Sequence, residues 1–149
     1  AKMLSIVPLL EGGGLYEAQA SRRTYERLAE IARGTISAGW PLIIDATFLK
    51  RAERDVFRRI ARDAGCPFAI IICRAPDDLL RKRLALRQRQ GHDASEATVA
   101  VLEHQLVAGE PLDAVELGEA IVADMTQPRP ADAVEQALVR RLGIRKSCT

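Results

Sequence analysis

The sequence predicts an α/β protein built on a parallel β-sheet. Three short apolar runs, at residues 41–45, 68–73 and 120–124, alternate with longer stretches in which apolar residues recur every three or four positions. Short apolar runs are typical of strands buried on both faces of a parallel sheet, and the longer periodic stretches are typical of amphipathic helices. Strands that alternate with helices indicate βαβ units, whose strands run parallel.

The helices are expected in the intervals between these strands. Serine, glycine and proline mark several of their ends, as an N-cap, a C-cap and a first helical residue, respectively. The expected helices are residues 22–37 after Ser21, 50–64 before Gly65, 77–90, about 95–108, a short turn from 113, and 130–142 starting at Pro130. Residues 144–149 are expected to form a tail, and the first twenty residues show the least regular pattern.

Composition indicates a single globular domain spanning residues 1–143. The chain has 149 residues, of which 48% are hydrophobic and 28% charged, an ordinary profile for a soluble protein. A net charge of +2 gives no indication of a nucleic-acid or membrane partner. Three cysteines without metal-ligand spacing suit a reducing compartment. With no signal peptide and no apolar run near ~20 residues, we expect a cytoplasmic protein.

The first predicted strand ends in a lone carboxylate. Asp45 follows the apolar run directly, and Ala46 and Thr47 come next. Open α/β sheets bind ligands at the carboxyl ends of their strands, and in phosphate-transfer enzymes an acid there holds Mg²⁺ or orients a phosphate-binding group. The alternative is that Asp45 caps the next helix or starts a turn.

Three consecutive glycines, Gly12 to Gly14, do not form a phosphate-binding loop. Such a loop reads Gly, four residues, then Gly-Lys-Ser/Thr, between a strand and a helix. Here Leu15, Tyr16 and Glu17 follow the glycines, so neither the lysine nor the hydroxyl is in place. A flexible loop is the favoured interpretation.

Basic residues crowd one predicted helix, that of residues 77–90. Arg83 and Arg87 are four positions apart and therefore share a helix face, where an anion between them would relieve their mutual repulsion. Arginines also supply paired donors to phosphate oxygens. The alternative is a solvated basic face paired with nearby acids. The basic residues are Arg81, Lys82, Arg83, Arg87 and Arg89, and the acids are Asp77, Asp78 and Glu103.

Several motifs along the chain form a more specific signal together than any one does alone. They include Thr24-Tyr25-x-Arg27-Leu28, Ala38-Gly39-x-Pro41-Leu-Ile-Ile-Asp45-Ala46-Thr47-Phe48-Leu49-x-Arg51, Leu80-Arg81-x-Arg83-Leu84-x-x-Arg87 and Glu110-Pro111-Leu112-Asp113. Over residues 3–127 the set resembles the P-loop kinases of the polynucleotide-kinase-like and zeta-toxin-like ATP-binding group. The closest form is the kinase-like domain that follows an aminoglycoside-phosphotransferase-like domain.

The resemblance implies a three-layer αβα parallel sheet of P-loop kinase type that is incomplete. The first strand, the phosphate loop and the second strand of such domains have no counterpart here. The chain would then be the C-terminal part of an ATP-dependent kinase, forming one partial domain with a lid at about residues 77–109. ATP and Mg²⁺ are expected for the intact domain, and the isolated chain is expected to be inactive.

The same resemblance assigns roles to particular residues. Asp45 would act on Mg²⁺, with Thr47 supporting it and binding nucleotide. Arg83 and Arg87 would be catalytic lid residues, and with Arg89 they would also bind the nucleotide. The phosphoacceptor, a small molecule or a polynucleotide, stays open.

Other polar and aromatic residues have ordinary structural explanations. His104 is expected to be a solvated helix residue, and His92 to lie in the lid turn. Tyr16 and Tyr25 could face a phosphoacceptor, but core or surface positions are favoured. A second functional class also stays open, because unpaired sheet edges invite association. In that case the chain is a non-catalytic module that forms a homodimer, exchanges a strand or pairs with another chain.

Overall fold

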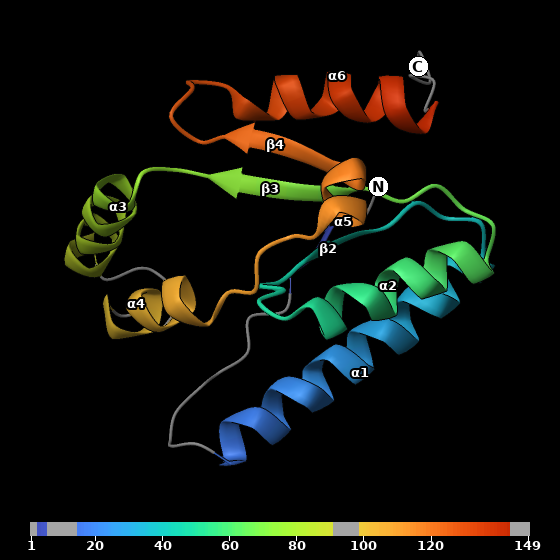
Figure 1. Cartoon of the computed structure of the whole chain (residues 1–149), viewed down its shortest axis with the longest axis horizontal. Coiled ribbons are helices and arrows are strands. Elements are labelled where there is room, and N and C mark those ends of the chain that lie inside the picture. The colour runs from blue at the N-terminus through green and yellow to red at the C-terminus, as the bar shows by residue number, and fades with distance from the viewer. Residues whose placement is uncertain (1–2, 6–14, 91–98, 144–149) are drawn as a thin grey trace. The chain divides into compact units, whose positions relative to one another are not determined.

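The computed structural model describes residues 3–5, 15–90 and 99–143, which form a mixed α/β protein as predicted (Figure 1). Four strands and six helices are distributed along these residues. In chain order they are β1 (Met3–Ser5), α1 (Leu15–Ser37), β2 (Ile43–Asp45), α2 (Arg51–Asp63), β3 (Ile70–Arg74), α3 (Asp77–Gln90), α4 (Val99–Ala108), α5 (Ala114–Glu119), β4 (Ala120–Asp124) and α6 (Pro130–Leu142).

The chain divides into two compact units. The first unit comprises residues 1–66 and 92–110 and contains β1, α1, β2, α2 and α4. The second comprises residues 67–91 and 111–149 and contains β3, α3, α5, β4 and α6.

In the first unit, β1 and β2 form a parallel pair. Met3 lies beside Ile43 and Ser5 beside Asp45, so the two strands end together. The helices α1 and α2 run side by side (Figure 1). Each presents an apolar stripe to the core, and burying a large apolar side chain contributes about 1.5–3 kcal/mol. The buried residues of these stripes are Leu28, Ala29, Ala32, Phe57, Ile60 and Ala61.

Two features at the start of the chain differ from the prediction. The helix α1 begins at Leu15 and not at 22, so Ser21 lies inside it and is no N-cap. Residues 17–20 are Glu-Ala-Gln-Ala, all good helix formers, so nothing stops the helix there. The strand β1 was not predicted, because three residues are too few to show a periodic pattern.

The helix α2 agrees closely with its prediction. Lys50 is its N-cap, and the backbone N–H of Lys50 donates to the Glu53 carboxylate, one half of a capping box. At the other end Ala64 is the C-cap, and Gly65 has a φ of +63°, the left-handed conformation predicted for it.

In the second unit, β3 and β4 form a parallel pair in which Arg74 lies beside Asp124. The helix α6 lies along β4 (Figure 1). Ile121 and Ala123 of β4 are buried, whereas Val122 between them is 51% exposed. The burial of β4 therefore alternates. In β2 and β3, Ile43 is 44% and Ile71 is 37% exposed, so the prediction that these two strands are buried on both faces is wrong. Each sheet has two strands within the described residues, so every strand has a strand neighbour on one side only there.

The ends of the helices in the second unit were well predicted. Asp113 caps α5, where its carboxylate accepts the Glu116 N–H at 2.8 Å. Pro130 is the first residue of α6, and Arg141 of that helix donates to the Ala120 carbonyl at 3.0 Å. The predicted loop at Gly12–Gly14, the turn at His92, the start of the helix predicted at about 95–108 and the tail at 144–149 fall outside the described residues. Across the part of the chain described here, no helix combines the length and the apolar character needed to span a bilayer.

Candidate functional site

Asp45 is the last residue of β2 and lies at the carboxyl end of the β1–β2 pair. Its side chain is exposed, and the carboxylate forms no hydrogen bond or ion pair with any residue that the structure describes. Ligands of open α/β sheets bind at this end of the strands. Both carboxylate oxygens are therefore available to a cation or a donor at the position where a ligand is expected.

The loop after Asp45 is anchored by Tyr25 from α1. The Phe48 N–H donates to the Tyr25 hydroxyl oxygen at 2.9 Å, and the same hydroxyl lies 3.3 Å from the Thr47 hydroxyl. The rings of Tyr25 and Phe48 are tilted against each other with centroids 5.4 Å apart. One tyrosine thus fixes both a side chain and a backbone group of the loop.

Phe48 occupies a strained backbone conformation. Its φ of +46° lies in the left-handed region, which costs a residue other than glycine about 1–3 kcal/mol. Its carbonyl accepts a hydrogen bond from the Arg54 guanidinium at 2.9 Å, and its ring meets the edge of Phe57 at 5.3 Å. Both peptide groups of Phe48 are bonded, which offsets the strain and fixes the turn.

Arg54 and Glu110 hold the far end of this loop. The Arg54 side chain, from a residue only 6% exposed, also donates to the Leu49 carbonyl at 3.4 Å. The Glu110 N–H donates to the same carbonyl at 2.8 Å, and the Glu110 carboxylate accepts the Arg51 N–H at 2.7 Å. An acid at the start of α2 is also favoured by the helix dipole. The loop is therefore fixed at both ends.

The environment of Tyr25 keeps its hydroxyl protonated. Burial is the largest influence and raises the pKa of Tyr25, because it disfavours the phenolate. Hydrogen bonds from Thr47 and Phe48 act in the opposite direction, and the nearby Glu53 adds to the rise. Tyr25 is thus a neutral hydroxyl that both donates and accepts at physiological pH.

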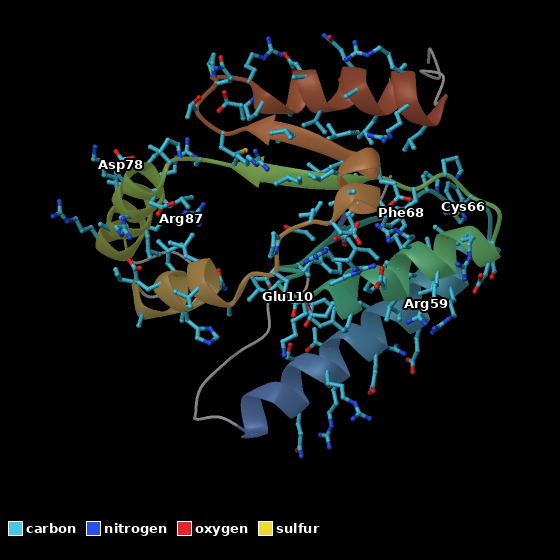
Figure 2. The ribbon with its side chains drawn as sticks, in the orientation of Figure 1. Arg59, Cys66, Phe68, Asp78, Arg87 and Glu110 are labelled. Carbon is cyan, nitrogen blue, oxygen red and sulfur yellow. The ribbon has the colours of Figure 1, made fainter. Side chains whose placement is uncertain are left out.

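The predicted lid arginines lie on α3 in the second unit. Arg83 donates to the Met125 carbonyl, just after β4, at 2.8 Å. Arg87 and Arg89 are exposed, and Figure 2 shows Arg87 on this helix. A guanidinium has five N–H donors, so the bond to Met125 leaves Arg83 with donors for a phosphate. On the same helix, Lys82 pairs with Asp78 at 3.4 Å.

The predicted site residues thus form two groups, one in each unit. Asp45 and Thr47 share the anchored loop of the first unit. Arg83, Arg87 and Arg89 share one helix of the second unit. The first group has the geometry of a ligand-binding loop, and the second has the charge of a phosphate-binding helix. Their roles in binding or catalysis stay predictions.

The sequence analysis missed three residues that build the loop: Tyr25, Arg54 and Glu110. Tyr25 was considered as a residue facing a phosphoacceptor, with a core or surface position favoured, and not as an anchor of this loop. Arg54 could have been found from its spacing, because it shares a helical stripe with Phe57 and Ala61, both buried. A charged residue on an inward stripe needs partners, and here these are loop carbonyls. Nothing in the local sequence pattern indicates that Glu110 reaches α2.

A second strand-terminal acid, Asp124, lies at the end of β4 and was also missed. Its carboxylate accepts hydrogen bonds from the Thr126 N–H at 2.9 Å, the Thr126 hydroxyl at 2.6 Å and the Gln127 amide at 3.1 Å. The Thr126 hydroxyl is the largest cause of a lowered pKa for Asp124, because these bonds favour the charged form. The oxygens of this acid are therefore used within its own turn.

A cation at Asp45 would need ligands from outside the protein. Within residues 3–5, 15–90 and 99–143, no three side chains among His, Cys, Asp and Glu gather closely enough to hold a metal ion. Mg²⁺ commonly binds one or two carboxylates and completes its shell with water and substrate phosphates. A single exposed carboxylate therefore fits a magnesium–phosphate complex better than a resident metal.

A family model described as an AAA domain matches residues 5–112 of the chain. The chain belongs to this family, which is P-loop kinase-like. The match covers both Asp45 and the three arginines of α3, and members of this family generally bind ATP with Mg²⁺. Neither a curated protein nor a solved structure matches the chain significantly.

Proposed function

We propose that the chain acts in ATP-dependent phosphoryl transfer to a hydroxyl acceptor, within the polynucleotide-kinase-like and zeta-toxin-like group. The observation that carries the proposal is the Asp45 carboxylate at the carboxyl end of a parallel strand. It has no partner among the described residues, and the loop that follows it is bonded by Tyr25, Arg54 and Glu110. Phosphoryl transfer depends mainly on positioning and charge neutralisation, and a fixed loop with an available acid suits that task.

Each predicted residue has a defined part in this proposal. Asp45 binds the Mg²⁺ that accompanies the nucleotide, and the Thr47 hydroxyl bonds a phosphate oxygen. Arg83 and Arg87 donate to the phosphate oxygens and neutralise charge as the phosphoryl group moves, with Arg89 binding the nucleotide beside them. ATP supplies the phosphoryl group, and the acceptor is either a small molecule with a hydroxyl or a polynucleotide end.

The sequence contains no Gly-x-x-x-x-Gly-Lys-Ser/Thr loop, so the 149 residues lack the lysine that grips the terminal phosphates. We therefore expect the isolated chain to bind ATP with Mg²⁺ weakly and to show no phosphotransferase activity by itself. Binding, and not turnover, is the property to measure.

The test is the thermal stability of the chain with increasing ATP and Mg²⁺. A ligand present at 100 times its dissociation constant adds about 2.7 kcal/mol to the free energy of unfolding. We expect a rise in melting temperature with the wild type and a reduced rise with Asp45→Asn. Asp63→Asn is the matched control, because Asp63 is an exposed acid that pairs with Arg62 at the end of α2. No rise at millimolar nucleotide, or an equal rise in Asp45→Asn, would overturn the proposal.

We also propose a second candidate function, self-association through strand edges. Two-stranded sheets of parallel strands expose backbone edges, and Ile43 of β2 is 44% exposed while Trp40 before it is 69% exposed. The occupant of such an edge would be a second copy of this chain. Sedimentation velocity from micromolar to millimolar chain tests it: a dimer that grows with concentration supports association, and a monomer at every concentration contradicts it.

A further inference from the structure

Two strands of the molecule end in the same short pattern, Asp-x-Thr. Asp45 ends β2 and is followed by Ala46 and Thr47, whereas Asp124 ends β4 and is followed by Met125 and Thr126. Both aspartates are the last residue of a parallel strand. The local sequence thus offers both segments the same turn, in which a threonine bonds back to an aspartate two positions earlier.

The segment after β4 adopts that turn. The Thr126 N–H and hydroxyl both donate to the same oxygen of Asp124, at 2.9 and 2.6 Å. Gln127 donates to the other oxygen at 3.1 Å. The carboxylate is fully engaged by its own neighbours, so a cation approaching Asp124 would have to displace these donors.

The segment after β2 does not adopt that turn. The Thr47 hydroxyl bonds Tyr25 at 3.3 Å, and neither the hydroxyl nor the backbone N–H of Thr47 bonds Asp45. The next residue, Phe48, turns the chain at a φ of +46° and gives its N–H to Tyr25 at 2.9 Å. Tyr25 therefore bonds both Thr47 and Phe48, the residues that follow Asp45 and Ala46 in the chain.

We propose that Tyr25 is a positioning residue that draws Thr47 away from Asp45 and thereby leaves the Asp45 carboxylate open to a divalent cation carried by a nucleotide. This inference rests on the proposed function, because it assigns Asp45 to the cation of the ATP complex. It adds a residue from α1 whose hydroxyl touches neither cation nor nucleotide. The comparison within the chain carries the argument: the same Asp-x-Thr pattern, without a tyrosine, closes on itself after β4.

The test uses the full chain labelled with ¹⁵N and manganese(II)·ATP as the probe, because Mn²⁺ broadens NMR signals of residues near it. In the wild type we expect loss of the Asp45 and Ala46 amide signals as the probe is added. In Tyr25→Phe we expect about fivefold weaker binding at Asp45, because a threonine donor now competes with the cation. In the same variant without ligand, hydrogen exchange at the Thr47 amide slows, because this amide gains the bond to Asp45.

The double variant Tyr25→Phe, Thr47→Val separates positioning from simple loss of structure. Valine has no hydroxyl to return to Asp45, so binding at Asp45 is expected to recover at least half of the loss. Thr24→Val is the matched control, since the Thr24 hydroxyl bonds only the Ala20 carbonyl of its own helix at 3.0 Å, and it is expected to bind as the wild type does.

The outcomes distinguish this inference from the proposed function. If the wild type shows no broadening at Asp45, both are overturned, because there is no cation for Tyr25 to admit. If the wild type shows it and Tyr25→Phe binds equally well, only the role of Tyr25 is overturned. A double variant that binds as weakly as Tyr25→Phe, without slowed hydrogen exchange at the residue 47 amide, also overturns it, because the loss would then come from a disordered loop and not from residue 47.

Discussion

The loop after β2 and the turn after β4 start from similar sequence and reach opposite structures. In the turn after β4, the Asp124 carboxylate accepts only donors within three residues of it, although the Met125 backbone also bonds Arg74 and Arg83. The loop after β2 is held by three residues distant from it in sequence or on another element: Tyr25, Arg54 and Glu110. The Asp124 carboxylate is thereby hydrogen-bonded within its own turn, and the Asp45 carboxylate is left available to a ligand. A strand-terminal acid is thus made available by its surroundings and not by its position alone.

The comparison also separates local from long-range sources of structure. A turn closed by its own neighbours can form whenever the strand before it forms. A loop that contains a left-handed phenylalanine needs the helices around it to be in place first. Substitutions in α1 and α2 should therefore affect the loop after β2 much more than the turn after β4.

The largest effect is expected at Arg54. Arg54→Met keeps the apolar part of the side chain but leaves the Phe48 and Leu49 carbonyls without the guanidinium donor. Arg54 is only 6% exposed, so water does not readily replace this donor. We expect a loss of about 2–4 kcal/mol in the free energy of unfolding, measured by urea denaturation. Arg59→Met on the same helix is exposed and should cost under ~0.5 kcal/mol. A loss at Arg54 no larger than that at Arg59 would show that the loop does not depend on it.

The strain at Phe48 gives the next largest effect. Phe48→Ala and Phe48→Gly both remove the ring contacts with Tyr25 and Phe57. Glycine adopts a φ of +46° freely, whereas alanine does not, so the glycine variant should be the more stable by about 1 kcal/mol. At an ordinary helix position the order is reversed. Equal stability of the two variants in urea, or a more stable alanine variant, would mean that the loop relaxes when the ring is removed.

The contrast between the two segments also explains what could be read from the sequence. The strands 120–124 and 43–45 and the helices α2, α3 and α6 follow from apolar spacing and from ends marked by glycine or proline, and their parallel pairing follows from the alternation of strands with helices. Asp45 could be singled out because it ends an apolar run. Its free carboxylate could not, because that depends on Tyr25, twenty positions earlier, and no local pattern reports a contact of that kind.

The sequence analysis wrongly predicted that strands are buried on both faces of the sheet. An apolar run indicates that a segment prefers to be covered, and it says nothing of how many neighbours the strand obtains. In the described residues each sheet stops at two strands, and Ile43 and Val122 keep about half of their surface. The apolar pattern therefore fixed the type of element and overstated its burial.

The ionisation of Tyr25 should make the first unit sensitive to alkali. The pKa of Tyr25 is raised above its ordinary value, which is about 10, chiefly by burial. Its stabilising contribution is fully present below the unfolded value and is lost as pH rises through the folded value, because the unfolded chain releases this proton first. We expect the unfolding free energy of the wild type to fall above about pH 10 and that of Tyr25→Phe to fall less steeply. Identical slopes, measured in urea at several pH values, would contradict the assignment.

The smallest effect is expected at Asp124, where the sign is opposite. Hydrogen bonds from Thr126 lower the pKa of this carboxyl, so its contribution is present above the unfolded value, about 3.9, and is lost as pH falls through the folded value. Thr126→Val removes the hydroxyl that is the largest cause of the lowered pKa. The titration midpoint of the Asp124 carboxyl, followed by its ¹³C signal, should therefore move upward toward that of an ordinary aspartate. A midpoint that stays low in Thr126→Val would show that the backbone N–H and Gln127 suffice to close the turn, and the contrast between the two Asp-x-Thr segments would then rest on the backbone and not on the threonine hydroxyl.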